Sequence, residues 1–275
     1  MSTAGHPPLL PLVPPVATAA AMKACCAAVY GHDVVTLLLG ESYHPGGAAL
    51  TRRLADVLGL RPGERVVDVA SGVGTTALLL AEHHDVEVVG VDLGEIQVTK
   101  ARAQARRLGL DHKALFEIGD AERLALADAS FDAVVCECAL CTFPGKQAAL
   151  AELARVVRPG GRVGITDVWL DPHRLDPELG GLAGRLASLA DARPIAEVRA
   201  MVQGAGLDVT ALERHDDALL ATIEQIETRL RALRLADLAM LRGLDLRRGI
   251  DLTRRAADAV RRGNAGYMLL AATKP

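Results

Sequence analysis

Aromatic residues are scarce in this chain, and long apolar runs are missing. Only 3% of its 275 residues are Phe, Trp or Tyr although 50% are apolar, so Ala, Leu and Val must build the core. The formal net charge is −3. Without a basic excess or many aromatics, we expect no nucleic-acid partner. No stretch reaches the roughly 18 uncharged apolar residues that cross a bilayer, so we expect no membrane partner.

Disulfide and export features are also lacking. The chain has five cysteines, an odd number, which favours a reducing compartment over a disulfide scaffold. No positive charge precedes the first apolar stretch, and Pro11, Pro14 and Pro15 interrupt that stretch. A signal peptide has the opposite pattern, so we expect a cytoplasmic protein.

Strand-like and helix-like segments alternate from residue 61 onward. Apolar runs predict strands at 66–70, 86–91, 114–118, 131–136 and 162–169, and helices at 75–82, 95–108 and from Pro144 to about 158. A helix and a strand follow at about 194–216. This alternation predicts an α/β fold with a doubly wound, mostly parallel sheet that helices cover on both faces.

Three regions flank that core, which we place at residues 61–216. Residues 1–60 are expected to form an N-terminal helical cap. Apolar residues recur at helical spacing from Leu219 to Leu233, and they predict a helical insertion at 217–263, before a last strand in 264–275. The insertion is a candidate homodimer contact. Its second helix carries six arginines among aspartates, which form either a salt-bridged face or an anion-binding face.

The segment Gly72-Val73-Gly74-Thr75-Thr76-Ala77 matches the dinucleotide fingerprint, which alone would indicate a nicotinamide-dependent oxidoreductase. However, Asp68 in the preceding strand would repel a pyrophosphate, whereas it suits an ammonium group. Asp92 ends the second strand, where its carboxylate can accept both hydroxyls of a ribose. The turn Gly119-Asp120-Ala121-Glu122 can contact the edge of an adenine. A ligand with an ammonium group, a ribose and an adenine but no phosphate is S-adenosylmethionine.

Four motifs in this order resemble the class I S-adenosylmethionine-dependent methyltransferases. They are Asp68–Gly74, Val89–Asp92, Gly119–Glu122 and Arg158–Gly161; the one mild departure is Ala70, where the family commonly has glycine. The resemblance implies S-adenosylmethionine as cofactor and a small-molecule methyl acceptor as partner. It also implies a set of cofactor-binding residues: Asp68, Ala70, Ser71, Gly72, Gly74, Thr75, Asp92, Leu93, Gln97, Asp120, Ala121, Glu122 and Cys136.

Three cysteines gather where the fourth strand ends, at the ligand side of such a sheet. If the strand stays extended, Cys136 and Cys138 share one face and Glu137 takes the other, while Cys141 returns over the same mouth. Packing in the core is one interpretation. A structural zinc site would need a fourth ligand such as Cys25, Cys26 or His44, and we predict no metal site. A third interpretation is a thiolate site for a soft acceptor.

A narrower resemblance bears on that third interpretation. Cys136–Ala139 and Gly164–Pro172, with Asp167 at its centre, are similar to the corresponding stretches of arsenite methyltransferases. Their fourth-strand cysteine would fall on Cys138. In the region comparable to their substrate loop this chain has Tyr43-His44-Pro45, without a cysteine. Their full thiolate set is therefore reproduced only if Cys25, Cys26 or Cys141 substitutes.

Two acceptor classes thus remain open. A soft thiol or arsenic acceptor would lie near Cys138 and Cys141 and needs no base. An O-, N- or C-acceptor needs a base, for which His44 and Glu137 are the candidates. A binding protein that keeps the cofactor pocket without turnover is a further alternative. We predict a small-molecule methyltransferase and name Cys138, Cys141, Glu137 and His44 as its catalytic candidates.

Overall fold

The computed structural model describes residues 23, 37–38, 40, 44–176, 178–179, 191–236 and 245–275. Most of the predicted N-terminal cap therefore lies outside the described residues, and so do Cys25, Cys26 and Tyr43. The boundary of that cap stays a prediction. Among the helices of the described ranges, none is long and apolar enough to span a membrane.

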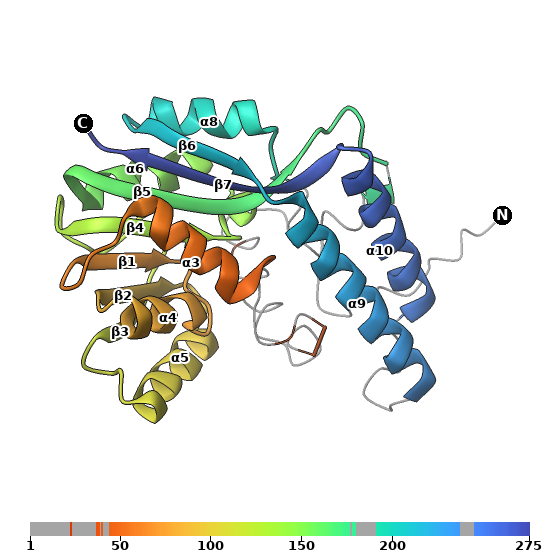
Figure 1. The fold of residues 1–275 in the computed structure, drawn as a ribbon, viewed down its shortest axis with the longest axis horizontal. Helices are drawn as coiled ribbons and strands as arrows, with labels where there is room; N and C mark the ends of the chain where they lie inside the picture. The colour runs from red at the N-terminus through yellow and green to blue at the C-terminus, as the bar shows by residue number, and fades with distance from the viewer. Residues whose placement is uncertain are drawn as a thin grey trace.

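The core is a seven-stranded sheet in the order β3-β2-β1-β4-β5-β7-β6 (Figure 1). The first five strands run parallel, and β7 is antiparallel to both of its neighbours. This confirms the predicted α/β fold with a mostly parallel sheet. The strands are β1 Arg65–Val69, β2 Glu87–Asp92, β3 Ala114–Ile118, β4 Phe131–Glu137, β5 Val157–Leu170, β6 Asp208–Arg214 and β7 Ala265–Thr273.

Helices cover both faces of the sheet. On one face, α3 (Gly47–Leu58), α4 (Thr75–His83) and α5 (Glu95–Leu108) share a buried apolar cluster with the strands. On the other, α6 (Lys146–Val156) and α8 (Ile195–Gly204) do the same. The strand order reverses between β1 and β4, and a crevice opens at such a point beyond the carboxyl ends of the strands.

The helix after β4 is shorter than predicted at both ends. Pro144 precedes the N-cap Gly145, and α6 begins at Lys146. The helix ends at Val156 because the chain from Val157 onward already belongs to β5 and pairs with β4. The pairing of this segment with β4 therefore ends the helix earlier than the sequence pattern predicted.

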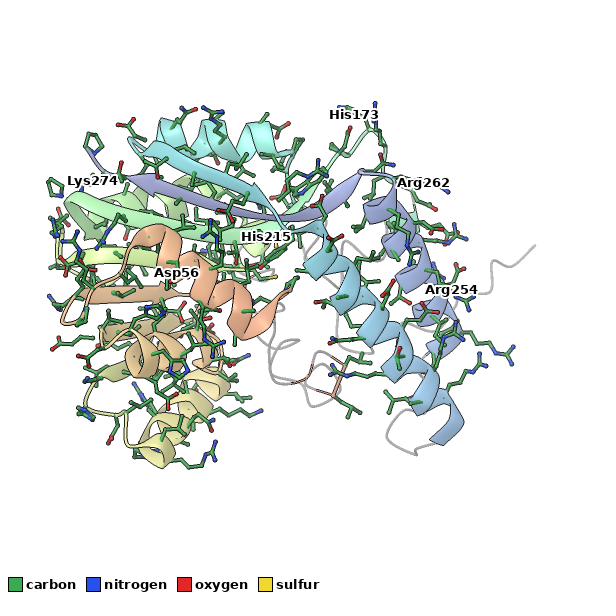
Figure 2. The ribbon with its side chains drawn as sticks, viewed as in Figure 1. Asp56, His173, His215, Arg254, Arg262 and Lys274 are labelled. Atoms are coloured by element: carbon green, nitrogen blue, oxygen red, sulfur yellow. The ribbon has the colours of Figure 1, made fainter. Side chains whose placement is uncertain are left out.

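The predicted insertion is present as α9 (Asp216–Ala236) and α10 (Leu246–Arg261). These helices follow β6 and precede β7 in the sequence, and the two strands pair with each other. Three of the six predicted arginines of this helix have acidic partners. Arg254 contacts Glu227, Arg255 contacts Asp251 and Asp176, and Arg261 contacts Glu224 and Asp258. Figure 2 shows Arg254 and Arg262 on the outer side of α10. The arrangement is that of a salt-bridged surface rather than an anion-binding face.

Candidate active site

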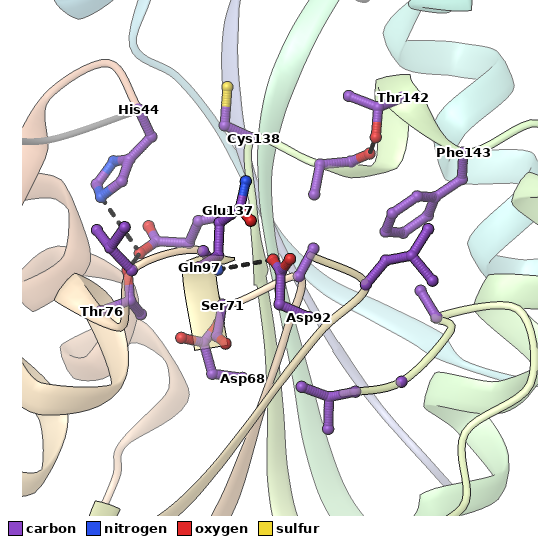
Figure 3. A pocket seen from close by; sticks show the side chains of 18 of the residues that line it. His44, Asp68, Ser71, Thr76, Asp92, Gln97, Glu137, Cys138, Thr142 and Phe143 are labelled. Atoms are coloured by element: carbon purple, nitrogen blue, oxygen red, sulfur yellow. Dashed lines mark hydrogen bonds and ion pairs between the residues drawn. The ribbon is translucent and has the colours of Figure 1, made fainter. Parts of the chain in front are cut away.

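A cavity lies at the carboxyl ends of β1, β2 and β4, where the topology predicts a ligand crevice (Figure 3). Thirteen of the predicted site residues line it: His44, Asp68, Ala70, Ser71, Gly72, Thr75, Asp92, Leu93, Gln97, Asp120, Ala121, Glu137 and Cys138. The fold therefore brings together residues from the N-terminal region, three βα loops and the end of β4. Their individual roles stay predictions.

The loop after β1 contains three residues with a left-handed backbone conformation. Gly72 and Gly74 have φ of 56° and 86°, and Ala70 has φ of 61°. A β-carbon at Gly74 would lie 2.7 Å from the Phe116 ring, so this glycine allows α4 to approach the sheet closely. Gly74 itself does not line the cavity. The left-handed backbone at Ala70 gives a physical reason for the glycine that the family commonly has there.

Asp68 and Ser71 carry buried polar atoms that have no partner within the described part of the chain. These atoms are Asp68 Oδ2 and Ser71 Oγ. Burial, together with the nearby carboxylates of Glu137 and Asp92, raises the pKa of Asp68 well above its usual value. Unsatisfied groups of this kind are costly unless a ligand completes them. They lie where the resemblance places the methionine end of the cofactor.

Asp92 at the end of β2 is held by two backbone amides. Gly72 N donates to Oδ2 at 2.8 Å, and Gly94 N donates to Oδ1 at 2.7 Å. Burial nevertheless raises the pKa of this carboxyl. Each carboxylate oxygen has a second lone pair, so Asp92 keeps acceptors for two ribose hydroxyls. The loop amide of Gly72, which a dinucleotide would need for its phosphates, is already occupied by this carboxylate.

The turn after β3 is joined to the N-terminal region by Lys23. Its Nζ lies 2.8 Å from Asp120 Oδ2 and 2.6 Å from Glu122 Oε2. Although partial burial opposes it, this contact lowers the pKa of Asp120. Glu122 does not line the cavity. Its Oε1 instead accepts the Gly145 amide at 2.7 Å, which ties the turn to the start of α6.

Glu137 and His44 form a buried pair in the wall of the same cavity. His44 Nε2 lies 3.6 Å from Glu137 Oε2, and Figure 3 shows the ring turned toward that carboxylate. The side chains are only 7% and 3% exposed, respectively. Oε2 also accepts from the hydroxyls of Thr51 and Thr76 at 2.9 and 2.7 Å. Sequence reasoning missed both threonines, because isolated threonines in helices carry no pattern that marks a site.

The three cysteines do not assemble as predicted. Cys138 has φ of 54°, so the strand ends at Glu137 and the expected alternation breaks. Cys136 is packed into the apolar cluster under α6 and α8, while Cys138 packs against the cluster on the other face. Cys141 is buried outside the cavity, and its thiol contacts Asp167. Cys136, predicted to bind cofactor, and Cys141, predicted to be catalytic, therefore do not reach the cavity.

Burial also decides the charge of these thiols. It raises the pKa of Cys136, Cys138 and Cys141 well above the usual range, and the nearby Asp167 carboxylate reinforces the effect. All three are uncharged at neutral pH, whereas soft-metal ligation needs thiolates. In the described ranges, no three His, Cys, Asp or Glu side chains are grouped in a way that would hold a metal ion.

Asp167 anchors the loop that carries Cys141. Its Oδ2 accepts the Cys141 amide and its Oδ1 accepts the Val168 amide, both at 2.7 Å. Burial raises the pKa of Asp167 to about 6 although these donors and Lys146 oppose the shift. The loop residues Thr142 and Phe143 line the cavity. The stretch that resembles arsenite methyltransferases thus shapes the cavity wall here.

Family comparison agrees with this geometry. A model of the methyltransferase domain matches residues 60–211, which is more than half of the chain. The chain belongs to this family. The prediction of a class I S-adenosylmethionine-dependent methyltransferase domain is therefore confirmed.

Individual relatives differ in their acceptors. The chain is 36% identical to the 27-O-demethylrifamycin SV methyltransferase of Amycolatopsis mediterranei over 51% of its own length and 56% of that protein. It is 31% identical to the arsenite methyltransferase of Halobacterium salinarum over 58% of its length and 41% of that protein. The chain thus spans about half the length of these curated relatives or less.

Among solved structures, the [4+2]-cyclase SpnF superposes with a TM-score of 0.75 at 23% identity, over 92% of this chain and 96% of the other. Likeness at this identity establishes the fold alone. Since that protein is described as a cyclase, a methyltransferase-like fold does not by itself specify the reaction. The reaction must be argued from the side chains.

The residues present fit S-adenosylmethionine. Three carboxylates line one cavity and lower its potential: those of Asp68 and Glu137, which are buried, and that of Asp92, which is half-buried. A ligand that carries a sulfonium and an ammonium group compensates this charge, whereas a pyrophosphate would add to the repulsion. The unsatisfied atoms of Asp68 and Ser71 offer an acceptor and a hydroxyl for such a ligand. The same features argue against the nicotinamide alternative.

Proposed function

We propose that the protein methylates a hydroxyl group of a small molecule, with S-adenosylmethionine as methyl donor and the His44–Glu137 pair as base. The observation that carries the proposal is the 3.6 Å approach of His44 Nε2 to the buried Glu137 Oε2 in the wall of the cavity. A base beside the acceptor is what oxygen methylation needs.

The cofactor end of the cavity is assigned to Asp68, Ser71, Asp92, Asp120 and Ala121. When bound, S-adenosylmethionine supplies a methyl group on a positively charged sulfur, which is already electrophilic. The protein therefore has two tasks. It aligns the acceptor with the methyl group, and it keeps water away from the reacting atoms.

Proton removal is the chemical task left to the protein. A neutral alcohol is a weak nucleophile, and methylation of its oxygen without loss of the proton would leave an oxonium. His44 Nδ1 lies 3.2 Å from the Pro45 carbonyl and donates to it, so Nε2 is the nitrogen that takes this proton. Glu137, whose Oε2 faces Nε2, stabilises the resulting imidazolium. The hydroxyls of Thr51 and Thr76 hold Glu137 Oε2 in place. This is the His44 and Glu137 alternative that the sequence left open.

The relative that methylates demethylrifamycin supports an oxygen acceptor, and its overlap with this chain is partial. The arsenite methyltransferase relative favours the soft-acceptor alternative at the level of sequence. Against that alternative, the three described thiols are uncharged, and two of them, Cys136 and Cys141, are buried outside the cavity. The balance of these observations favours a hydroxyl.

The test compares acceptors and variants in one assay. Purified protein is offered labelled S-adenosylmethionine with a panel of aliphatic and phenolic alcohols that includes 27-O-demethylrifamycin SV, and with arsenite and small thiols. Methylation of an alcohol is expected. His44→Gln should lower kcat about 100-fold or more, and the exposed His112→Gln is the matched control. Methylation of arsenite or thiols alone, or a wild-type rate in His44→Gln, would overturn the proposal.

The predicted homodimer through α9 and α10 and the cytoplasmic location stay predictions. Sedimentation velocity of the full chain tests the first. A dimer that persists when the exposed Arg247 of α10 and the exposed Arg262 at its C-cap are changed to Glu would place the contact elsewhere.

A further inference from the structure

Glu137 is the meeting point of hydroxyls from three separate elements. Its Oε2 accepts from Thr51 of α3 and Thr76 of α4, whereas its Oε1 accepts from Thr166 Oγ1 of β5 at 3.2 Å. Thr166 Oγ1 in turn lies 3.0 Å from the hydroxyl of Tyr267 on β7. Both oxygens of this carboxylate therefore accept hydrogen bonds, Oε2 from the two helices and Oε1 from β5.

The direction of the hydrogen bonds on the Oε1 side follows from the number of hydrogens that each group can donate. An ionised carboxylate only accepts, and a threonine hydroxyl has one hydrogen to donate. Thr166 donates its only hydrogen to Glu137 Oε1, so Tyr267 must donate to Thr166. The single hydrogen of the phenol is then committed to Thr166. The chain of hydrogen bonds runs from Tyr267 through Thr166 to Glu137.

Tyr267 and Thr166 are fully buried, and Tyr267 belongs to the apolar cluster on the α3 side of the sheet. A valine and a phenylalanine would have nearly the same shapes. Without the Thr166 hydroxyl, however, Glu137 Oε1 would lose its donor and stay buried without a partner. The hydroxyls are therefore better explained by what they do to Glu137.

We infer that Tyr267 and Thr166 are positioning residues. They hold Oε1 of the Glu137 carboxylate so that its Oε2 faces His44. Neither residue lines the cavity, so both act through Glu137. The inference rests on the proposed role of the His44–Glu137 pair. It adds two residues, one on β5 and one on the last strand, to the groups that determine the geometry of the base.

The experiment uses Tyr267→Phe and Thr166→Val, which each remove one hydroxyl and little volume. Thr166→Ser restores the hydroxyl. Thr210→Val is the control, because Thr210 Oγ1 donates to the Ala271 carbonyl elsewhere in the same sheet. The first readout is the ¹⁵N spectrum of the histidine rings, in which the His44 signals are identified by their loss in His44→Gln. These signals should move in Tyr267→Phe and Thr166→Val, and stay in Thr166→Ser and Thr210→Val.

The second readout is the rate. In Tyr267→Phe and Thr166→Val, kcat should fall about tenfold, the value of one hydrogen bond to a charged group, while affinity for S-adenosylhomocysteine is retained. The double variant should lose no more than Thr166→Val alone, because both act through one contact. Unmoved His44 signals in both single variants, or a rate loss that Thr166→Ser does not restore, would overturn the inference. If no alcohol is methylated by wild type, the proposed function fails, and the ¹⁵N spectra still decide the positioning.

Discussion

Gly72 N donates a hydrogen bond of 2.8 Å to the Asp92 carboxylate, and this contact joins the glycine loop after β1 to the end of β2. The two residues belong to successive βα units of the parallel sheet. Since Gly94 N binds the other oxygen, the carboxylate is oriented before any ligand arrives. A preoriented acceptor loses little entropy when it binds two vicinal hydroxyls.

The first prediction concerns this carboxylate. Asp92→Ala should weaken S-adenosylhomocysteine binding by about 1.5–3 kcal/mol, because the ribose hydroxyls lose a charged acceptor. Isothermal titration calorimetry measures the change. The exposed Asp111→Ala is the control and should bind like wild type. Unchanged affinity in Asp92→Ala would remove Asp92 from the ribose site.

The second prediction separates the two cofactor classes. A ligand at 100 times its Kd adds about 2.7 kcal/mol to the free energy of unfolding. S-adenosylhomocysteine at such a concentration should therefore raise Tm by several degrees. NAD should leave it unchanged, because its pyrophosphate would meet the carboxylates of Asp68 and Asp92. Differential scanning fluorimetry gives both Tm values. A rise in Tm with NAD alone would contradict the interpretation of the cavity as a methyltransferase cofactor site.

The third prediction concerns the thiols. Because burial keeps them protonated, Cys138→Ser should retain activity within about threefold, whereas Cys136→Ser should lose about 1–3 kcal/mol of stability by burying a hydroxyl among apolar groups. Activity assays and urea unfolding measure the two effects. Complete loss of activity in Cys138→Ser, with folding intact, would restore the thiolate hypothesis and a soft acceptor.

Much of the fold could be predicted from the sequence, because its signals are local. Val66, Val67 and Val69 form an apolar run that only Asp68 interrupts, as expected of a central parallel strand, and all three valines are fully buried. Residues that line the cavity could be predicted for the same reason, since Asp68, Gly72 and Asp92 lie at fixed offsets from strand ends; their contacts with the cofactor stay predictions. Where a strand, its loop and an acidic residue follow one another in the sequence, the sequence motif also predicts which residues line the cavity.

The acceptor side could not be predicted in the same way, because it depends on contacts between distant elements. Thr51, Thr76 and Thr166 meet at Glu137 only once α3, α4 and β5 are packed. The error at the cysteines has a single physical cause. Cys138 adopts a left-handed backbone, so the two-residue alternation that would have placed it beside Cys136 stops one residue too early.

The last prediction concerns the dependence of stability on pH. Asp167 has a pKa of about 6 in the folded protein against 3.8 ordinarily, because it is buried. A carboxyl whose folded pKa is raised binds its proton more tightly when folded. Its contribution to stability is complete below about pH 4 and is lost as the pH rises through 6. The unfolding free energy of wild type relative to Asp167→Asn should therefore fall by about 2.4 kcal/mol from pH 4 to pH 8.

Urea unfolding of both proteins at a series of pH values measures that difference, and the subtraction cancels the groups that titrate equally in the two. Asp167→Asn also loses one acceptor for the amides of Cys141 and Val168, which lowers its stability at every pH by a constant amount. The slope of the difference is therefore the informative quantity. A difference that rises with pH would mean that the two amides and Lys146 outweigh burial and that Asp167 is ionised throughout, as a fixed anion beside the Cys141 thiol.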